Sequence, residues 1–183
     1  SGTYEVNDRV LADIENPPYG EHASNLGAPL SLRIAEKHGC KAYFVNPVSV
    51  DELTDKARIS GFKGMERESF FHALNQKAIA KLYAKDNGKN YNDLNIIVAH
   101  LGGGVSVGIH SKGKVIDVND ALRGEGPFSP ERSGGLPAAS VVDACFSGKY
   151  TEKQIRKMIS GEGGVVSYLG TNSFMDVENR VNA

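Results

Sequence analysis

The chain has little of what marks a nucleic-acid-binding, membrane-spanning or disulfide-rich protein. Its formal net charge is −1 over 183 residues, which gives no electrostatic case for binding nucleic acid or an acidic membrane. No apolar run approaches the roughly 20 residues that cross a bilayer. The only two cysteines, Cys40 and Cys145, lack the spacing of a metal site. Beside apolar neighbours they predict reduced, packed thiols in a cytoplasmic globular protein.

Two familiar phosphate-binding motifs are also missing from the most informative stretch, residues 94–108. Its apolar run at residues 96–99 predicts a strand buried on both faces, and the alternation over residues 105–110 predicts a second strand. The glycines between these strands are Gly102, Gly103 and Gly104. A dinucleotide fingerprint needs a helix after its glycines and a Walker loop needs Gly-Lys-Ser/Thr, so neither motif fits. What remains is a hairpin turn that either holds an anion, because glycine permits φ > 0 and close approach, or carries no ligand.

Predicted helices and short strands alternate along the rest of the chain. Helices are expected over residues 4–14, 23–37, 68–86, 137–146 and 151–160 and from residue 173, with further strands over 42–45 and 114–118. The helix over 68–86 has the clearest apolar stripe, and this stripe is predicted to face the core. Its members are Phe71, Leu74, Ala78, Ile79 and Leu82. A short polar joint at residues 89–93 predicts a boundary between two domains.

Two histidines are candidate catalytic groups. His72 and Asn75 lie one helical turn apart, and His100 ends the strand before the glycine turn, where a ligand can reach it. The plainer interpretation of His72 is a satisfied, partly buried histidine, and that of His100 is a capping hydrogen bond. A zinc site made by His22, His72 and His100 is disfavoured, because no pair has the short spacing of zinc ligands.

The long loop over residues 120–135 is the second candidate region, since loops of this length are more often functional than idle. Arg132, beside Glu131 near its end, can hold a carboxylate or a transferring phosphoryl group, or it can form an ion pair that pins the loop. With the glycine turn and a histidine donor, this arginine suggests phosphoryl transfer, which needs positioning and electrostatics rather than a covalent nucleophile. Magnesium would accompany the nucleotide, held mostly by water and phosphate.

The motifs closely resemble those of the butyrate kinases, a branch of the acetate kinase family in the sugar kinase, Hsp70 and actin superfamily. They are Phe-His-Ala-Leu-Asn at residues 71–75, His-Leu-Gly-Gly-Gly-Val-Ser-Val-Gly at 100–108 and Gly-Glu-Gly-Pro-Phe-Ser-Pro-Glu-Arg-Ser-Gly at 124–134. The resemblance implies an α/β fold of ribonuclease H-like (actin-like ATPase) domains. Residues 1–92 would be the later part of the N-terminal domain, and residues 93–183 would be the β-meander and first helices of the C-terminal domain.

The activity implied by the resemblance is that of a carboxylate kinase, which converts butyrate and ATP to butyryl phosphate and ADP with Mg²⁺. A kinase for isobutyrate or propionate, and a non-catalytic fragment of such an enzyme, stay open as alternatives. The resemblance places His72 and Arg132 beside the transferring phosphoryl group as catalytic residues. It assigns phosphate and nucleotide binding to His100, Gly102, Gly103, Gly104 and Ser106. Substrate or structural roles fall to Asn46, Asn75 and Glu131, and no side chain is expected to be a metal ligand.

The chain also departs from the family pattern. Asn46 stands where the family's strand-end motif leads us to expect aspartate. The family's first phosphate hairpin and its adenosine-binding glycines have no counterpart in these 183 residues. We therefore expect the middle part of a kinase, inactive by itself and homo-oligomeric or held by another chain, because an incomplete sheet has an unpaired edge.

Overall fold

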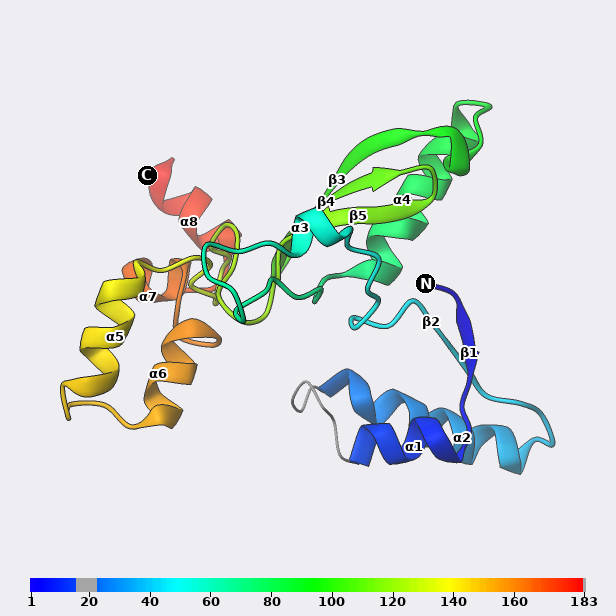
Figure 1. Cartoon of the computed structure of the whole chain (residues 1–183), viewed down its shortest axis with the longest axis horizontal. Helices are drawn as coiled ribbons and strands as arrows, with labels where there is room; N and C mark the ends of the chain where they lie inside the picture. Colours follow the sequence, from blue (N-terminus) through cyan, green and yellow to red (C-terminus); the bar gives the residue numbers. More distant parts are fainter. Residues whose placement is uncertain (16–22, 183) are drawn as a thin grey trace. The chain divides into compact units, whose positions relative to one another are not determined.

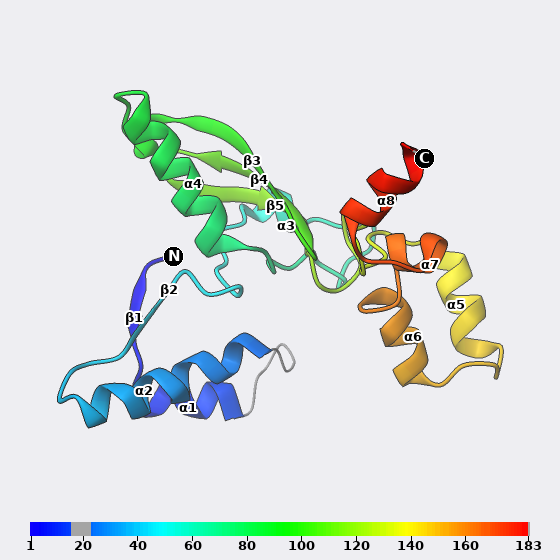
Figure 2. The ribbon, with the colours of Figure 1, turned by 180° about the vertical axis from the view of Figure 1, so that it is seen from behind.

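The computed structural model describes residues 1–15 and 23–182 and is drawn from opposite sides in Figures 1 and 2. The chain divides into two compact units, Ser1–Pro47 and Val48–Ala183. The long helix before the meander therefore shares a unit with the meander. The domain boundary expected near residues 92 and 93 stays a prediction.

The first unit consists of a two-stranded sheet and two helices. Its elements are β1 (Thr3–Glu5), α1 (Asp8–Glu15), the 3₁₀ turn η1 (Ala23–Leu26), α2 (Gly27–Lys37) and β2 (Tyr43–Val45). β1 pairs antiparallel with β2, which places Tyr4 opposite Phe44. The first helix starts later than predicted because Thr3–Glu5 joins this sheet. Gly39 follows α2 with φ of 62°, the left-handed conformation expected after a helix end.

The second unit is built around a three-stranded antiparallel meander. Its strands are β3 (Asn95–Leu101), β4 (Val105–Ser111) and β5 (Lys114–Val118), hydrogen-bonded in the order β3-β4-β5. Leu101 pairs with Val105, so the three glycines form the connecting turn as predicted. The prediction that the first strand is buried on both faces is wrong, because Ile97 is 70% exposed.

Helix α4 (Ala73–Asp86) lies along one face of this meander (Figures 1 and 2). Its buried residues are Ala73, Gln76, Lys77, Ala80 and Ala84. The predicted apolar stripe is wrong, because its leucines and isoleucine are about half exposed. The alanines let the helix approach the sheet closely, and Gln76 and Lys77 find polar partners beneath it, so small and polar residues form the buried face.

The remaining elements are helical. They are α3 (Asp55–Arg58), the 3₁₀ turn η2 (Tyr91–Asp93), α5 (Ala138–Phe146), α6 (Glu152–Ile159), α7 (Val165–Leu169) and α8 (Phe174–Val181). The capping box of Thr151 and Gln154 predicted for α6 is present. Cys40 and Cys145 are free but exposed, so the expectation of packed thiols is wrong. No helix within the described residues is long and apolar enough to cross a membrane.

Candidate active site

The glycine turn between β3 and β4 is where the chemically capable side chains meet. Gly104 lies against both the Arg132 guanidinium and the His72 ring: a Cβ on this residue would collide with Arg132 and would lie 3.1 Å from Cε1 of His72. Glu131 approaches the same turn, 3.9 Å from the Cβ position of Gly103. Two stretches far apart in the sequence, one at residue 72 and one at residues 131–132, therefore converge on this turn.

His72 and His100 stack face to face beside this turn. Their ring centroids are 3.7 Å apart and their planes differ by 9°. Nδ1 of His72 lies 2.9 Å from Oγ of Ser106, and Nδ1 of His100 lies 2.8 Å from the amide nitrogen of Asn75. Burial lowers the pKa of His100, which favours its neutral form in the stack.

The position of His72 follows from the residues that precede α4. Phe71 is only 2% exposed and packs in a cluster with Val50, Leu53 and Val118. His72 is the N-cap residue of α4, with non-helical φ and ψ of −79° and 60°. The buried phenylalanine thus fixes the entry into the helix, and the next side chain is left half-buried at the glycine turn.

Arg132 is held by backbone contacts that leave its charge unpaired. Its Nη1 donates to the carbonyl of Ala121 at 2.8 Å, and its backbone N–H donates to Oγ of Ser129 at 3.1 Å. Ser129 donates in turn to the carbonyl of Gly103 at 2.7 Å, which ties the loop to the turn. Within the described part of the chain, no carboxylate forms a salt bridge with Arg132. The guanidinium is therefore available to an anionic ligand.

The three glycines permit close approach rather than an unusual backbone. None of Gly102, Gly103 and Gly104 has a positive φ, so the expected left-handed conformation is not found. A Cβ on Gly102 would lie 2.8 Å from Nε2 of His100, and one on Gly104 would collide with an arginine. Gly103 is exposed, and nothing but Glu131 lies within 4 Å of its Cβ position. Its backbone is the open part of the turn.

Several predicted site residues occupy places that sequence reasoning did not foresee. Ser106 is fully buried and bonded to His72, so its predicted contact with phosphate stays a prediction. Asn46 belongs to the first unit, where its φ of 43° and its hydrogen bond from the Gly2 N–H (3.0 Å) close the strand pair. Its part in the site stays a prediction. His22 lies outside the described residues.

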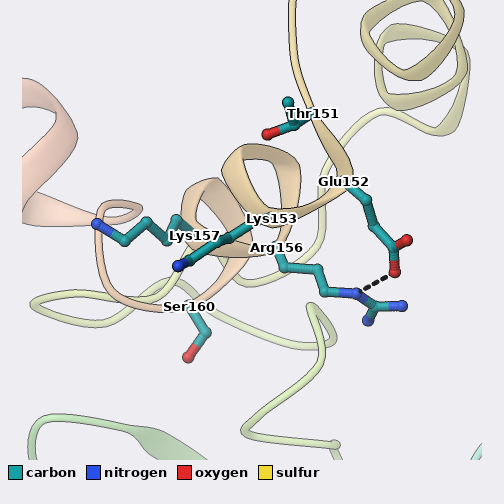
Figure 3. Close-up of a pocket in the computed structure, with 6 residues that line it drawn as sticks. All are labelled: Thr151, Glu152, Lys153, Arg156, Lys157 and Ser160. Atoms are coloured by element: carbon teal, nitrogen blue, oxygen red, sulfur yellow. Dashed lines mark hydrogen bonds and ion pairs between the residues drawn. The ribbon is translucent and has the colours of Figure 1, made fainter.

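The described ranges, 1–15 and 23–182, contain no group of three His, Cys, Asp or Glu side chains placed to hold a metal ion. A shallow hollow of about 670 Å³ lies along α6 (Figure 3). It is lined by Thr151, Glu152, Lys153, Arg156, Lys157 and Ser160. Arg156 donates to Glu152 at 2.7 Å, and Lys157 pairs with Glu162 at 2.8 Å, so these charges are already engaged. None of the candidate residues lines this hollow.

Sequence reasoning missed Gln76, which supports the histidines from inside the unit. Its Nε2 donates to Oγ of Ser106 at 2.8 Å and to the carbonyl of the same residue at 3.0 Å. The available signal was the four-residue spacing from His72, which places both on one face of a helix. Ser129 gave no such signal, because its role depends on how the long loop folds back on the turn.

The model of the acetokinase family matches residues 63–182, which include His72, the glycine turn and Arg132. The chain belongs to the acetokinase family. This membership confirms the family predicted from the motifs.

Curated relatives lie among the butyrate kinases of this family. The chain is 60% identical over 178 residues to butyrate kinase 2 of Clostridium acetobutylicum, covering 97% of this chain and 50% of that protein. It is 54% identical over 182 residues to a probable butyrate kinase of Listeria innocua, covering 100% of this chain and 51% of the relative. The chain thus spans about half the length of the curated relatives it matches.

Two solved structures share the fold of this acetokinase-family chain. The acetate kinase of Porphyromonas gingivalis matches with a TM-score of 0.80 at 18% identity, over 100% of this chain and 48% of that chain. A propionate kinase of Francisella tularensis matches with a TM-score of 0.78, also at 18% identity, over 99% of this chain and 49% of that chain. The predicted α/β fold of this kinase group is therefore confirmed.

Proposed function

We propose that this chain supplies part of the active site of a butyrate kinase, which transfers a phosphoryl group between ATP and butyrate. The observation that carries the proposal is that Gly104 lies against both His72 and Arg132, an arginine with which no described carboxylate forms a salt bridge. An exposed backbone, a cation and a ring donor at one turn suit an anion with several oxygens. The curated relatives named butyrate kinases, at 60% and 54% identity, support the choice of acid.

In the proposed reaction a carboxylate oxygen of butyrate attacks the γ-phosphorus of ATP. The bond from that phosphorus to the bridging oxygen breaks, and ADP leaves with the electron pair, so no proton has to be transferred. Arg132 offsets the negative charge on the transferring group, and His72 donates a hydrogen bond to it. The backbone of Gly102, Gly103 and Gly104, with His100 beside it, binds nucleotide phosphate.

Magnesium is expected with the nucleotide, but the described residues offer no cluster that would hold it by side chains alone. Phosphate oxygens and water usually supply most of its ligands in kinases. When bound, the ion would neutralise phosphate charge.

Further parts of the proposal concern the whole protein. We infer a homo-oligomeric cytoplasmic enzyme whose two domains meet near residues 92 and 93, with Asn46, Asn75 and Glu131 in supporting roles. The 183 residues alone are expected to be inactive. A kinase for propionate or isobutyrate is the second candidate, since a protein titled a propionate kinase shares the fold.

The deciding experiment traps acyl phosphate with hydroxylamine in the presence of ATP, Mg²⁺ and butyrate. It compares the 183-residue polypeptide, its mass verified, with a full-length enzyme in which these residues replace the matching half of butyrate kinase 2 of C. acetobutylicum. We expect product from the full-length enzyme only. Product with propionate or isobutyrate but not with butyrate would change the assigned substrate to that acid and would leave the kinase activity in place. If the full-length enzyme is folded but forms no acyl phosphate with any of the three acids, the proposal is refuted.

A further inference from the structure

A row of buried polar side chains runs from His72 through the interface between α4 and the meander. It passes from His72 to Ser106, Gln76, His110 and Tyr91, in that order. Successive donor and acceptor atoms are 2.9, 2.8, 3.0 and 2.8 Å apart. The three middle members are 0% exposed, and Tyr91 is 7% exposed. Buried groups of this kind must satisfy one another, so the direction of each hydrogen bond can be worked out.

The orientation of Gln76 is fixed by a backbone carbonyl. The carbonyl oxygen of Ser106 can only accept, so the atom 3.0 Å from it is the amide nitrogen of Gln76. That nitrogen also donates to Oγ of Ser106. The amide oxygen therefore faces Nε2 of His110 and can only accept, which places a proton on that nitrogen.

The hydroxyl proton of Ser106 then has only one acceptor left, the His72 ring. Its oxygen accepts from Gln76 Nε2 at 2.8 Å and from the backbone N–H of His72 at 3.4 Å, which occupies both lone pairs. A third accepted bond, from a protonated Nδ1 of His72, has no lone pair to receive it. The hydroxyl consequently donates to Nδ1, and the proton of the His72 ring is on Nε2.

The far end of the row is consistent with this assignment. Burial, with Lys77 nearby, lowers the pKa of His110 to about 4, so its ring is neutral at pH 7. With Nε2 protonated, Nδ1 of His110 accepts, and the hydroxyl of Tyr91 donates to it at 2.8 Å. Burial also raises the pKa of Tyr91 to about 12, which keeps this donor protonated. Every hydrogen bond from Tyr91 to His72 then points toward the glycine turn.

We propose that Gln76 is a positioning residue that, through Ser106, keeps the proton of His72 on Nε2, so that the ring offers a hydrogen-bond donor from that nitrogen. His110 and Tyr91 hold the Gln76 amide in the required orientation. Aligned hydrogen bonds polarise one another, so the row also strengthens the donor at its end. The arrangement of protons depends only on the geometry, whereas its value for catalysis rests on the proposed function.

The proton position can be measured without assaying activity. In the full-length enzyme with ¹⁵N-labelled histidine, long-range ¹H–¹⁵N correlation spectra distinguish a protonated from an unprotonated ring nitrogen. The His72 signals are those lost in His72→Gln. We expect His72 to be neutral with the proton on Nε2. A neutral ring with the proton on Nδ1, or a cation at pH 7, would overturn the assignment before any other variant is made.

Gln76→Met tests which residue imposes that proton position. The substitution removes one donor to Ser106 at similar volume, which leaves a lone pair for a protonated Nδ1. We expect both forms of the ring to appear, and kcat to fall at least about tenfold with KM for ATP within twofold, as for residues that orient a reacting group. Ring signals unchanged from the parent would refute the role of Gln76. A mixture of the two neutral forms of the His72 ring with unchanged kcat would support the role of Gln76. It would instead contradict the proposed catalytic role of His72.

Ala78→Gly is the matched control, because Ala78 lies within α4 but is exposed and is not among the helix residues buried against the meander. It should destabilise the helix by about 1 kcal/mol without moving the proton of His72. A shift of the proton in this variant as well would mean that general loosening of α4, not Gln76, is responsible, and the proposal would fail.

Discussion

Arg67, Arg123 and Arg132, which lie in or contact the long loop over residues 120–135, differ in how their charge is matched. Arg67 donates to Asp117 at 2.9 Å and to Glu125, and Arg123 donates to Asp120 at 2.9 Å and to Glu68. Arg132, a few residues later, donates to a carbonyl and has no salt bridge with any described carboxylate. The paired arginines tie neighbouring segments together, whereas no described carboxylate neutralises Arg132, the arginine that we propose for an anionic ligand. The same residue type is thus found in two electrostatic settings.

Replacing the unpaired arginine should have the largest effect. Arg132→Ala in the full-length enzyme should lower kcat by about 100-fold or more, because charge on the transferring group loses its partner. Stability should change little. Arg123→Ala should do the reverse, with a lower free energy of unfolding by urea and kcat within a few-fold of the parent. Equal losses of kcat in Arg132→Ala and Arg123→Ala would contradict the distinction between a catalytic and a structural arginine.

Two adjacent glycines of the turn offer a second test of the role of Arg132. Gly103 faces open space, whereas Gly104 lies against the Arg132 guanidinium. Gly103→Val places a branched side chain where the structure has space, so folding should survive while KM for ATP rises about tenfold by blocked approach of phosphate. Gly104→Ala instead pushes on the Arg132 guanidinium, so kcat should fall more than KM rises. Steady-state kinetics on both variants separate the two effects. Unchanged KM in Gly103→Val would mean that phosphate does not approach this backbone.

An effect on stability instead of kinetics concerns His110, a neutral group beside a buried ion pair. Burial first, and Lys77 second, lower its pKa to about 4 from 6.5, while Glu52 acts in the opposite direction. The unfolded chain therefore binds the extra proton between pH 6.5 and 4, so stability is full above 6.5 and falls as the pH drops to 4. The loss amounts to at most about 3 kcal/mol. His110→Gln should flatten this part of the urea-unfolding profile against pH, and a profile of unchanged slope would contradict the assignment.

Local features of the fold could be predicted because they depend on nearby residues. The alternation of the meander, the glycine turn and the capping box at Thr151 each follow from a few positions. The buried face of α4 could not, because hydrophobicity favoured Leu74 and Ile79 over Gln76 and Lys77. The polar pair is buried because partners from the meander and from Glu52 satisfy it, including a Lys77–Glu52 ion pair of 2.8 Å. Hydrophobic periodicity along the sequence cannot predict such contacts, because they depend on residues distant in the chain.

In the candidate site, too, local motifs could be predicted from the sequence and tertiary contacts could not. His72, His100 and Arg132 were found by residue type and motif, and the structure brings them to one turn. The support by Gln76 and Ser129 was missed, since it depends on which loop closes over which strand. The glycines were expected for an unusual backbone and are instead required for space. The motifs indicate the candidate groups, and the packing decides how these groups are held.

The two cysteines have a practical consequence. Both thiols are free and exposed, Cys40 in the first compact unit and Cys145 in the second. The chain contains no third cysteine, so the native residues provide one attachment point for a fluorescent dye in each unit. Energy transfer between two such dyes would report how the separation of the units changes when a nucleotide or an acyl phosphate is added, with every native residue retained.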